Sequence, residues 1–365
     1  MPRETGGSEI YVRRLVPALL EARDDLRLTL FVAREAEESL RAEPWSREVG
    51  LVRLPVRAER RTRRVLAEQT LLPAAVRKAR VDLLHNAFST APAAPGAPQV
   101  TTILDVIYKL YPETHEGLLA KGMSALVSLA ARRSRRILTL SEAAKDDIAK
   151  FLLVDRARID VTPLGPGLRN EVRPVPEEEL RRRLDLGSAP IILTVSAKRP
   201  HKNLERLFEA FVRLSAPEPP VLVVPGYKTP FEAELRRRAA AAAGQRIRFA
   251  GWLDDATLAG LYQAAACLVF PSLAEGFGLP VLEAMRSGLP VSCSNTSSLP
   301  EIAGDAAQYF DPTDADDMAR AVSELLQDSE RRETLRLRGL ERARTFSWER
   351  TAEATLASYA RALGE

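Results

Sequence analysis

The sequence predicts an α/β fold made of two doubly wound, Rossmann-like domains. Short β-branched segments alternate with helical segments along almost the whole chain, which is typical of parallel sheets covered by helices on both faces. A stretch at 164–180, rich in proline and charge, interrupts this alternation, and we interpret it as a linker. The length of 365 residues also favours two domains over one.

The first series of elements precedes the linker and predicts a domain over 1–170. Its expected strands are 27–32, 51–56, 81–87, 99–106 and 135–141, and its expected helices are 9–22, 117–133 and 141–152. A domain of this type normally begins with a strand that runs into a glycine loop. Here Gly6 and Gly7 leave no room for it, so either the start is placed late or the domain lacks its central strand; we favour a truncated or misassigned start.

The second series predicts a domain over 185–345. Its expected strands are 191–197, 221–226, 246–252, 267–272 and 290–295, and its expected helices are 204–215, 230–242, 255–266 and 280–288. Two such domains in tandem predict a central cleft at the carboxyl ends of their strands, where open α/β folds bind ligands.

Composition excludes several classes of protein. No apolar stretch approaches the roughly 20 residues of a membrane-spanning helix, and the N-terminus lacks the apolar core of a secretory signal. Two cysteines make no disulfide framework, and three dispersed histidines show no metal-ligand spacing. The net charge of +4 is spread over helical segments, as on a solvated surface; attraction to phosphates or to an anionic membrane is the other interpretation. No nucleic-acid recognition motif is found, so a nucleic-acid partner is not expected.

The strongest chemical signal is the segment 275–291. Pro280 suits a first helical turn, so the preceding glycine loop would present free backbone N–H groups at a helix N-terminus, which is an anion site. Glu275 lies before this loop, and we expect Glu283 in the first turn of the helix. Two carboxylates around an anion-binding turn suit a phosphate ligand with hydroxyl groups on either side. A strand–turn–helix corner with glutamate caps is the alternative on spacing alone.

This segment resembles the E-x7-E signature of family-4 glycosyltransferases, retaining enzymes with the GT-B fold of two facing Rossmann-like domains. The resemblance implies that Glu275 approaches the donor sugar and that Glu283 holds the ribose hydroxyls. It also implies that the N–H groups of Phe277, Gly278 and Leu279 contact the sugar and the diphosphate.

A basic cluster at 195–211 is the second signal. Lys198, Arg199 and Lys202 lie where a strand gives way to a helix, and cations there can neutralise a leaving diphosphate. The resemblance matches Lys202 to the family's phosphate-binding lysine. The arginine that usually accompanies it has no clear counterpart, and either Lys198 or Arg199 could take its place.

Two signals fall in the first domain. Gly6 and Gly7 precede a helix and resemble the family's loop against the donor diphosphate, although a plain turn fits equally well. Asp105 follows an expected strand at the place of the family's His-Asp pair, where this sequence has Leu104 instead of histidine. Asp105 is therefore expected either near the donor sugar or as a helix or turn cap, and the substitution puts activity and sugar choice in question.

Further matches extend the resemblance over nearly the whole chain. Leu253, in the segment 251–253, corresponds to the strand end that packs against the nucleotide base, and 346–365 to a terminal helix that returns to the first domain. The segment 293–307 looks most like bacterial mannosyltransferases of polysaccharide assembly. Asp314 and Asp316 imitate a D-x-D metal motif, but their context is that of a helix start.

The resemblance implies a metal-independent hexosyltransferase without a cofactor, whose co-substrate is a nucleotide diphosphate sugar. GDP-mannose is the expected donor, UDP-glucose or UDP-N-acetylglucosamine the alternative, and a glycan or lipid-linked saccharide the acceptor. We expect a cytoplasmic protein with possible peripheral contact at the inner membrane face. The rival interpretations are a nucleotide-sugar epimerase, a non-catalytic nucleotide-sugar-binding scaffold protein and, weakest, an NAD-dependent oxidoreductase.

Overall fold

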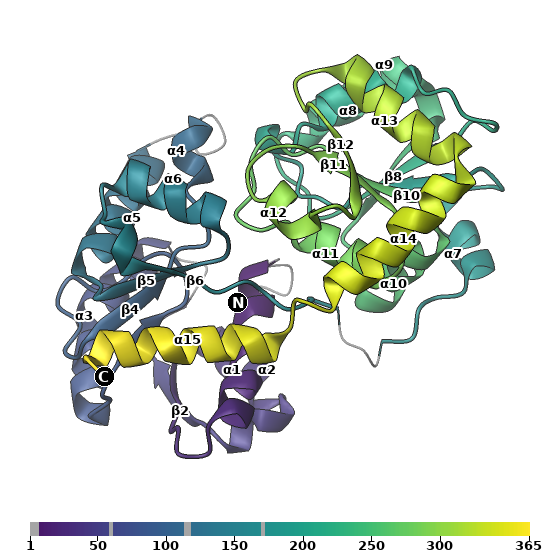
Figure 1. The fold of residues 1–365 in the computed structure, drawn as a ribbon. Coiled ribbons are helices and arrows are strands. Elements are labelled where there is room, and N and C mark those ends of the chain that lie inside the picture. Colours follow the sequence, from purple (N-terminus) through teal and green to yellow (C-terminus); the bar gives the residue numbers. More distant parts are fainter. Residues whose placement is uncertain (1–6, 58–60, 113–117, 169–171) are drawn as a thin grey trace. The chain divides into compact units, whose positions relative to one another are not determined.

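The fold is that of a computed structural model, which describes residues 7–57, 61–112, 118–168 and 172–365. The chain forms two compact units (Figure 1). Unit 1 contains Met1–Leu110, His115–Gly165 and Ser347–Glu365, and unit 2 contains Tyr111–Thr114 and Pro166–Phe346.

Unit 1 carries its strands in two separate parallel sheets. The strands β1 (Thr29–Ala33) and β2 (Gly50–Leu54) form one pair, and β3 (Leu84–Asn86), β4 (Gln99–Thr102), β5 (Arg136–Thr139) and β6 (Ile159–Val161) form the other sheet in that order. The helices are α1 (Gly7–Ala22), α2 (Arg34–Arg41), η1 (Pro44–Arg47), α3 (Arg61–Ala79), α4 (Ile107–Leu110), α5 (Leu118–Arg133), α6 (Glu142–Leu152), η3 (Arg156–Arg158) and α15 (Trp348–Leu363). Ser141 begins α6 as its N-cap, and its hydroxyl accepts a hydrogen bond from the N–H of Ala144 at 3.0 Å.

The terminal helix α15 packs on the second sheet of unit 1, along β4, β5 and β6 (Figure 1). Asp160 on β6 accepts a hydrogen bond from Ser358 at 2.6 Å and forms an ion pair with Arg361 at 2.9 Å, and both partners lie on α15. Arg136 on the neighbouring strand β5 donates to the same carboxylate at 2.9 and 2.5 Å. The end of the chain is therefore held to unit 1 by polar contacts as well as by packing.

Unit 2 contains one continuous parallel sheet of six strands, in the order β12-β11-β10-β7-β8-β9. These strands are β7 (Ile191–Leu193), β8 (Val221–Pro225), β9 (Ile247–Gly251), β10 (Cys267–Phe270), β11 (Val291–Ser294) and β12 (Ala307–Phe310). The helices are α7 (Glu177–Leu184), η4 (Pro200–Lys202), α8 (Leu204–Val212), α9 (Glu232–Ala243), η5 (Gly244–Arg246), α10 (Asp255–Ala264), α11 (Leu279–Arg286), α12 (Leu299–Ala303), α13 (Ala315–Gln327) and α14 (Ser329–Ala343).

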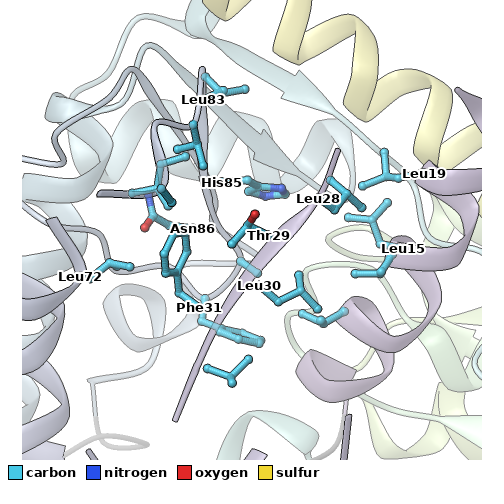
Figure 2. Close-up of a pocket in the computed structure, with 18 of the residues that line it drawn as sticks. Leu15, Leu19, Leu28, Thr29, Leu30, Phe31, Leu72, Leu83, His85 and Asn86 are labelled. Atoms are coloured by element: carbon cyan, nitrogen blue, oxygen red, sulfur yellow. The ribbon is translucent and has the colours of Figure 1, made fainter. Parts of the chain in front are cut away.

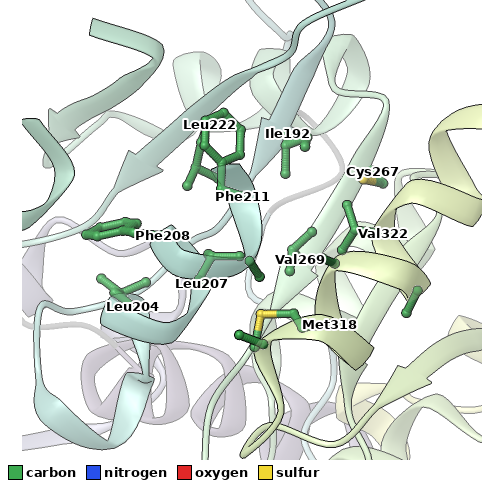
Figure 3. Close-up of a cluster of buried hydrophobic side chains, with 14 of the residues drawn as sticks. Ile192, Leu204, Leu207, Phe208, Phe211, Leu222, Cys267, Val269, Met318 and Val322 are labelled. Carbon is green, nitrogen blue, oxygen red and sulfur yellow. The ribbon is translucent and has the colours of Figure 1, made fainter. Parts of the chain in front are cut away.

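One large apolar core covers a face of this sheet. Side chains of α8 and α13 pack on residues of β7, β8 and β10 (Figure 3). Phe208 and Phe211 from α8 and Met318 from α13 are almost completely buried there. These strands are apolar in nearly every position, as expected of strands covered on both faces. The loops of unit 2 thus project from a sheet with a continuous apolar core.

The structure corrects two predictions on elements. The stretch 164–180 is not a linker over its whole length, because α7 begins at Glu177, where three glutamates occupy the favourable first turn. Two strands, β6 and β12, had no counterpart among the expected strands. Both strands are short, so neither appears as a long apolar run in the sequence. The strand β6 also follows directly on the 3-10 turn η3. Among the described helices, none combines the length and apolar character that a bilayer crossing requires.

Candidate functional site

The loops after β7 and β10 leave the same edge of the sheet in unit 2. The two strands are parallel neighbours, with Ile192 opposite Cys267, and the order of strands reverses between them. Such a reversal is the switch point of a doubly wound sheet, where loops diverge and ligands bind. One loop carries Lys202 and the other carries Glu275. Neighbouring strand ends therefore bring together two residues that are far apart in the sequence.

Lys202 and Glu275 form a close ion pair within unit 2. The ammonium Nζ lies 2.5 Å from Oε1 of Glu275, and the side chains are only 15% and 11% exposed. Nζ also lies 5.5 Å from the centre of the Phe270 ring, a distance at which a cation is attracted to the ring face. Each of the two charges, which have little access to water, is thus compensated by the other.

Hydrogen bonds fix the two loops to each other. The side chain of Asn203 donates to the carbonyls of Pro271 and Pro312 at 3.1 and 2.8 Å, and the N–H of Leu273 donates to the carbonyl of His201 at 2.8 Å. Asn203 has a φ of 56°, a left-handed conformation that asparagine tolerates better than most residues. Lys202 and Glu275 consequently come from a preorganised pair of loops.

The loop after β11 supports the glycine loop from the other side. The hydroxyl of Ser298 donates to the carbonyls of Glu275 and Phe277 at 3.0 and 2.8 Å. Ser297 donates to the carbonyl of Glu275 at 2.8 Å and accepts from its N–H at 3.1 Å. These serines therefore satisfy two carbonyl groups of the loop, those of Glu275 and Phe277.

The glycine loop ends at the N-terminus of α11. Gly278 is the N-cap residue, with a φ of 105°, and a Cβ there would lie 2.7 Å from Leu299. The left-handed backbone conformation favours glycine there, whereas the leucine side chain can move aside. Within the described part of the chain, the N–H groups of Gly278 and Leu279 have no recorded acceptor. Free N–H groups at a helix N-terminus attract an anion such as a phosphate.

Glu283 lies behind this helix start. It is the fifth residue of α11, so its predicted place in the first turn is wrong, because the helix begins at Leu279. Its carboxylate is buried and accepts a hydrogen bond from the Tyr262 hydroxyl at 2.9 Å. Burial raises the pKa of Glu283 from 4.5 to about 7, and the hydrogen bonds from Tyr262 and the Leu168 N–H lower it only in part.

Comparison with known proteins identifies the family. The model "Glycosyltransferase Family 4" matches residues 5–166, and "Glycosyl transferases group 1" matches residues 176–342. The O-antigen chain mannosyltransferase B of Escherichia coli is 32% identical over 71% of this chain and 69% of its own length. This chain is a family 4 glycosyltransferase.

Two further similarities are more limited. The serotype-specific mannosyltransferase WbdA of Escherichia coli is 32% identical over 63% of this chain, and the match spans only 29% of WbdA. The structure of Anabaena Alr3699/HepE in complex with UDP and glucose superposes with a TM-score of 0.76 over 98% of this chain and 96% of that one, at 18% identity. The glycosyltransferase thus has the GT-B fold expected from its sequence.

The other basic residues of the cluster at 195–211, Lys198 and Arg199, are placed differently from Lys202. Lys198 is fully buried, and its ammonium donates to the carbonyl of Gly226 at 2.8 Å. Burial lowers its pKa to about 8. A donor would reach this ammonium only after a rearrangement, so the structure does not present Lys198 as a phosphate ligand. Arg199 is half-buried and directly precedes the turn η4.

The remaining predicted residues lie elsewhere in unit 2 or in unit 1. Leu253 is half-buried after β9, beside Trp252, whose side chain is 48% exposed. Gly6 lies outside the described residues, and Gly7 is the first residue of α1. Asp105 accepts a hydrogen bond from the N–H of Ile107 at 3.1 Å, in the turn directly before α4. The contacts of these residues with a donor stay predictions.

Three residues that contact the candidate site were not predicted from the sequence. Ser297 and Ser298 hold the glycine loop, and Tyr262 contacts Glu283. The serines lie inside the segment 293–307 that resembles mannosyltransferases, so this resemblance could have indicated them. Tyr262 lies in α10 and is completely buried, and nothing in its sequence context distinguishes it from a core residue. The D-x-D residues behave as expected of a helix start, because Asp314 caps α13.

The raised pKa of Glu283 predicts that the free energy of unfolding depends on pH. Because its pKa is about 7 in the folded protein and 4.5 as a model value, the folded state favours the protonated carboxyl. Its contribution to stability is complete below pH 4.5 and is lost as the pH rises through 7. Relative to Glu283→Gln, which keeps an acceptor for Tyr262, the wild type should lose about 3 kcal/mol of unfolding free energy between pH 5 and pH 8. Urea unfolding of both proteins at both pH values measures this; a constant difference would contradict it.

Proposed function

We propose that this glycosyltransferase transfers mannose from GDP-mannose to a glycan or lipid-linked saccharide, with retention of configuration and without a metal ion. The observation that carries the proposal is the Lys202–Glu275 pair, which lies at the sheet's switch point and on the two loops that include the free helix N-terminus of α11. The choice of mannose is supported by the relatives named as mannosyltransferases.

The proposed reaction breaks the bond between the sugar C1 and the diphosphate oxygen. Negative charge grows on the departing phosphate, and Lys202 with the N–H groups of Gly278 and Leu279 provides the positive charge that stabilises it. The acceptor hydroxyl attacks C1 from the face that the phosphate leaves, and a phosphate oxygen takes its proton. The new glycosidic bond keeps the configuration of the donor, and no side chain has to become covalently attached.

Glu275 has a second role in this proposal. Without a donor, its carboxylate is paired with Lys202. When a diphosphate binds, it competes for the ammonium, and the carboxylate becomes available for the hydroxyl groups of the sugar. Exchange of partners keeps both charges compensated in a site with little water, which avoids a buried, unpaired ion. The positive charge needed at the phosphates comes from the protein, which supports a metal-independent reaction. The proposed location is the cytoplasm, at the inner membrane face when the acceptor is lipid-linked.

The proposal is tested by binding and turnover in EDTA. Calorimetric titration should show tighter binding of GDP than of UDP. Assays on a mannose-containing acceptor should show faster turnover of GDP-mannose than of UDP-glucose or UDP-N-acetylglucosamine. NMR of the product should show the anomeric configuration of the donor. Gly278→Ala should weaken nucleotide binding at least about tenfold, because a residue with a Cβ is strained at a φ of 105° and the loop would shift to relieve it. Asp316→Asn, on an exposed side chain paired with Arg213, is the matched control and should leave activity unchanged.

Other outcomes distinguish the alternatives. Tighter binding of UDP and turnover of UDP-glucose would identify UDP-glucose as the donor in place of GDP-mannose. The likeness to the Anabaena protein solved with UDP and glucose favours this alternative. Loss of turnover in EDTA that Mg²⁺ restores would contradict the metal-free mechanism. Nucleotide binding without turnover on any acceptor would favour a binding protein, and release of a free rearranged sugar would favour an epimerase.

A further inference from the structure

The carboxyl group of Glu283 is held by the protein from two sides. From α10, the hydroxyl of Tyr262 donates to Oε2 of Glu283 at 2.9 Å. From the chain segment that leads into unit 2, the N–H of Leu168 donates to the same carboxyl group. Leu168 is itself fixed, because its carbonyl accepts a hydrogen bond from Arg286 on α11 at 2.8 Å. Three separate segments of unit 2 therefore meet at this carboxyl group.

Tyr262 and Glu283 differ in their access to a ligand. Tyr262 is completely buried, whereas Glu283 keeps 7% of its surface exposed. A buried phenol needs a hydrogen-bond acceptor, and the carboxyl group provides it. An ionised carboxylate has about four acceptor positions, of which Tyr262 and Leu168 use two. The positions that remain can accept hydrogen bonds from a ligand that reaches the exposed part of Glu283.

The start of α11 decides which part of a donor lies near Glu283. In the proposed function, the N–H groups of Gly278 and Leu279 bind the diphosphate. Glu283 follows Leu279 by four helical residues, about 6 Å along the helix axis. In a nucleoside diphosphate the ribose adjoins the phosphates, and its hydroxyl groups are hydrogen-bond donors. A carboxylate at this distance suits those hydroxyl groups, and this assignment rests on the proposed function.

We propose that Tyr262 is a positioning residue for recognition of the donor: its hydroxyl holds the carboxylate of Glu283 in the orientation in which it accepts hydrogen bonds from the ribose hydroxyl groups. Tyr262 does not touch the donor, because it is completely buried, and acts only through Glu283. Tight binding of the nucleotide then requires the ribose hydroxyl groups, and the contribution of these groups depends on Tyr262.

The hydroxyl of Tyr262 also favours the charged form of the carboxyl group. Burial raises the pKa of Glu283 to about 7, and the hydrogen bond from Tyr262 lowers it in part. The negative charge of Asp255 on α10 raises this pKa, whereas the Leu168 N–H and the charge of Arg286 lower it. An ionised carboxylate accepts stronger hydrogen bonds than a neutral acid. Removing the hydroxyl of Tyr262 therefore increases the protonated fraction at neutral pH and weakens the acceptor for the ribose.

The test compares GDP with 2′,3′-dideoxy-GDP, which lacks both ribose hydroxyl groups, by calorimetric titration of the full chain at pH 7. We expect the wild type to bind GDP at least about tenfold more tightly, because hydrogen bonds to a charged acceptor provide such a factor. In Tyr262→Phe, GDP should bind about tenfold more weakly, whereas the affinity for dideoxy-GDP should not change. If UDP binds more tightly than GDP, the corresponding uracil nucleotides are compared instead.

Tyr359→Phe in unit 1 is the matched control. It also removes one tyrosine hydroxyl that is bonded to an ionisable side chain, because Tyr359 forms a 2.7 Å hydrogen bond with Nδ1 of His85. His85 lines a cavity of unit 1 together with residues of β1 and β3 (Figure 2). This variant should leave the affinities for GDP and dideoxy-GDP unchanged.

A double variant shows whether Tyr262 acts through Glu283. Glu283→Gln alone should lose most of the preference for GDP, and the addition of Tyr262→Phe should then weaken GDP binding no further. This comparison also serves if Tyr262→Phe alone does not fold. A further loss of about tenfold in the double variant would overturn the proposal. Unchanged GDP binding in Tyr262→Phe would overturn it as well, and so would equal weakening of GDP and dideoxy-GDP, which is the result of a purely structural role.

The dependence on pH gives a second measurement. Between pH 7 and pH 9 the carboxyl group of Tyr262→Phe should ionise, so this variant should regain most of its affinity for GDP. Dideoxy-GDP, measured at the same pH values, corrects for other groups that titrate. Absence of recovery would contradict the proposal. A wild type that binds GDP and dideoxy-GDP equally would overturn the role of the ribose alone, whereas a wild type that binds no nucleotide would overturn the proposed function itself.

Discussion

Replacing Lys202 with alanine is expected to lower kcat by at least about 100-fold, with a folded protein. In the proposed mechanism its ammonium stabilises the charge that develops on the leaving diphosphate, and no other described ammonium lies within hydrogen-bonding distance of Glu275. The fold-change in kcat should be larger than the fold-change in KM, because the negative charge on the diphosphate is larger at the transition state than in the bound donor. Steady-state kinetics with the preferred donor measures both.

The accompanying variants separate chemistry from folding. Lys202→Ala leaves the carboxylate of Glu275 without its partner in a site that is only 11% exposed, so some loss of stability is expected. The double variant Lys202→Ala with Glu275→Gln should recover that stability and remain inactive. Arg237→Ala removes an exposed cation paired with Glu234 on α9, and should change neither property. Wild-type kcat in Lys202→Ala would contradict the proposed role.

Replacing Asp160 with alanine is expected to destabilise unit 1 by about 3 kcal/mol. The carboxylate receives hydrogen bonds from Arg136 and Ser358 and pairs with Arg361. Its removal leaves the mostly buried guanidinium of Arg136 without its carboxylate partner. Burial alone would raise the pKa of Asp160, but the bonds from Arg136 and Ser358 outweigh it and lower the pKa. Since α15 loses its polar anchor, its amides should exchange faster. Urea unfolding and hydrogen exchange measure the two effects.

The matched control is Arg361→Ala. Arg361 makes the half-exposed contact to the same carboxylate, and exposed ion pairs contribute little, so we expect a loss below about 1 kcal/mol. If Asp160→Ala were no more destabilising than Arg361→Ala, the cluster would not be what holds α15 to the sheet.

Much of the fold followed from hydrophobic periodicity. The strands expected at 191–197, 221–226, 246–252, 267–272 and 290–295 are present as β7 to β11, with their ends within a few residues. They are apolar runs bounded by glycine, proline or charge, and such runs are typical of buried parallel strands. The short strands β6 and β12 and the start of α7 were not predicted, because sheet pairing and a favourable helix start decide them more than apolar length does.

For the candidate site, spacing and residue type indicated Glu275, Lys202 and the glycine loop as a group. The sequence could not show that Lys198 turns into the interior to bond the carbonyl of Gly226, since neighbours along a chain can point in opposite directions. It also could not show the Tyr262 contact that accompanies the raised pKa of Glu283. Both depend on elements that approach only after the sheet has formed.

The sequence by itself determined the alternating α/β pattern, the family and the residue types at the donor loops, because these are local properties of composition and spacing. The tertiary structure alone decided which side chains meet. It paired Lys202 with Glu275 through the register of β7 and β10, and it left a cavity lined by both sheets of unit 1. The physical reason is that strand order and register are set by long-range pairing and burial, which no short stretch of sequence encodes.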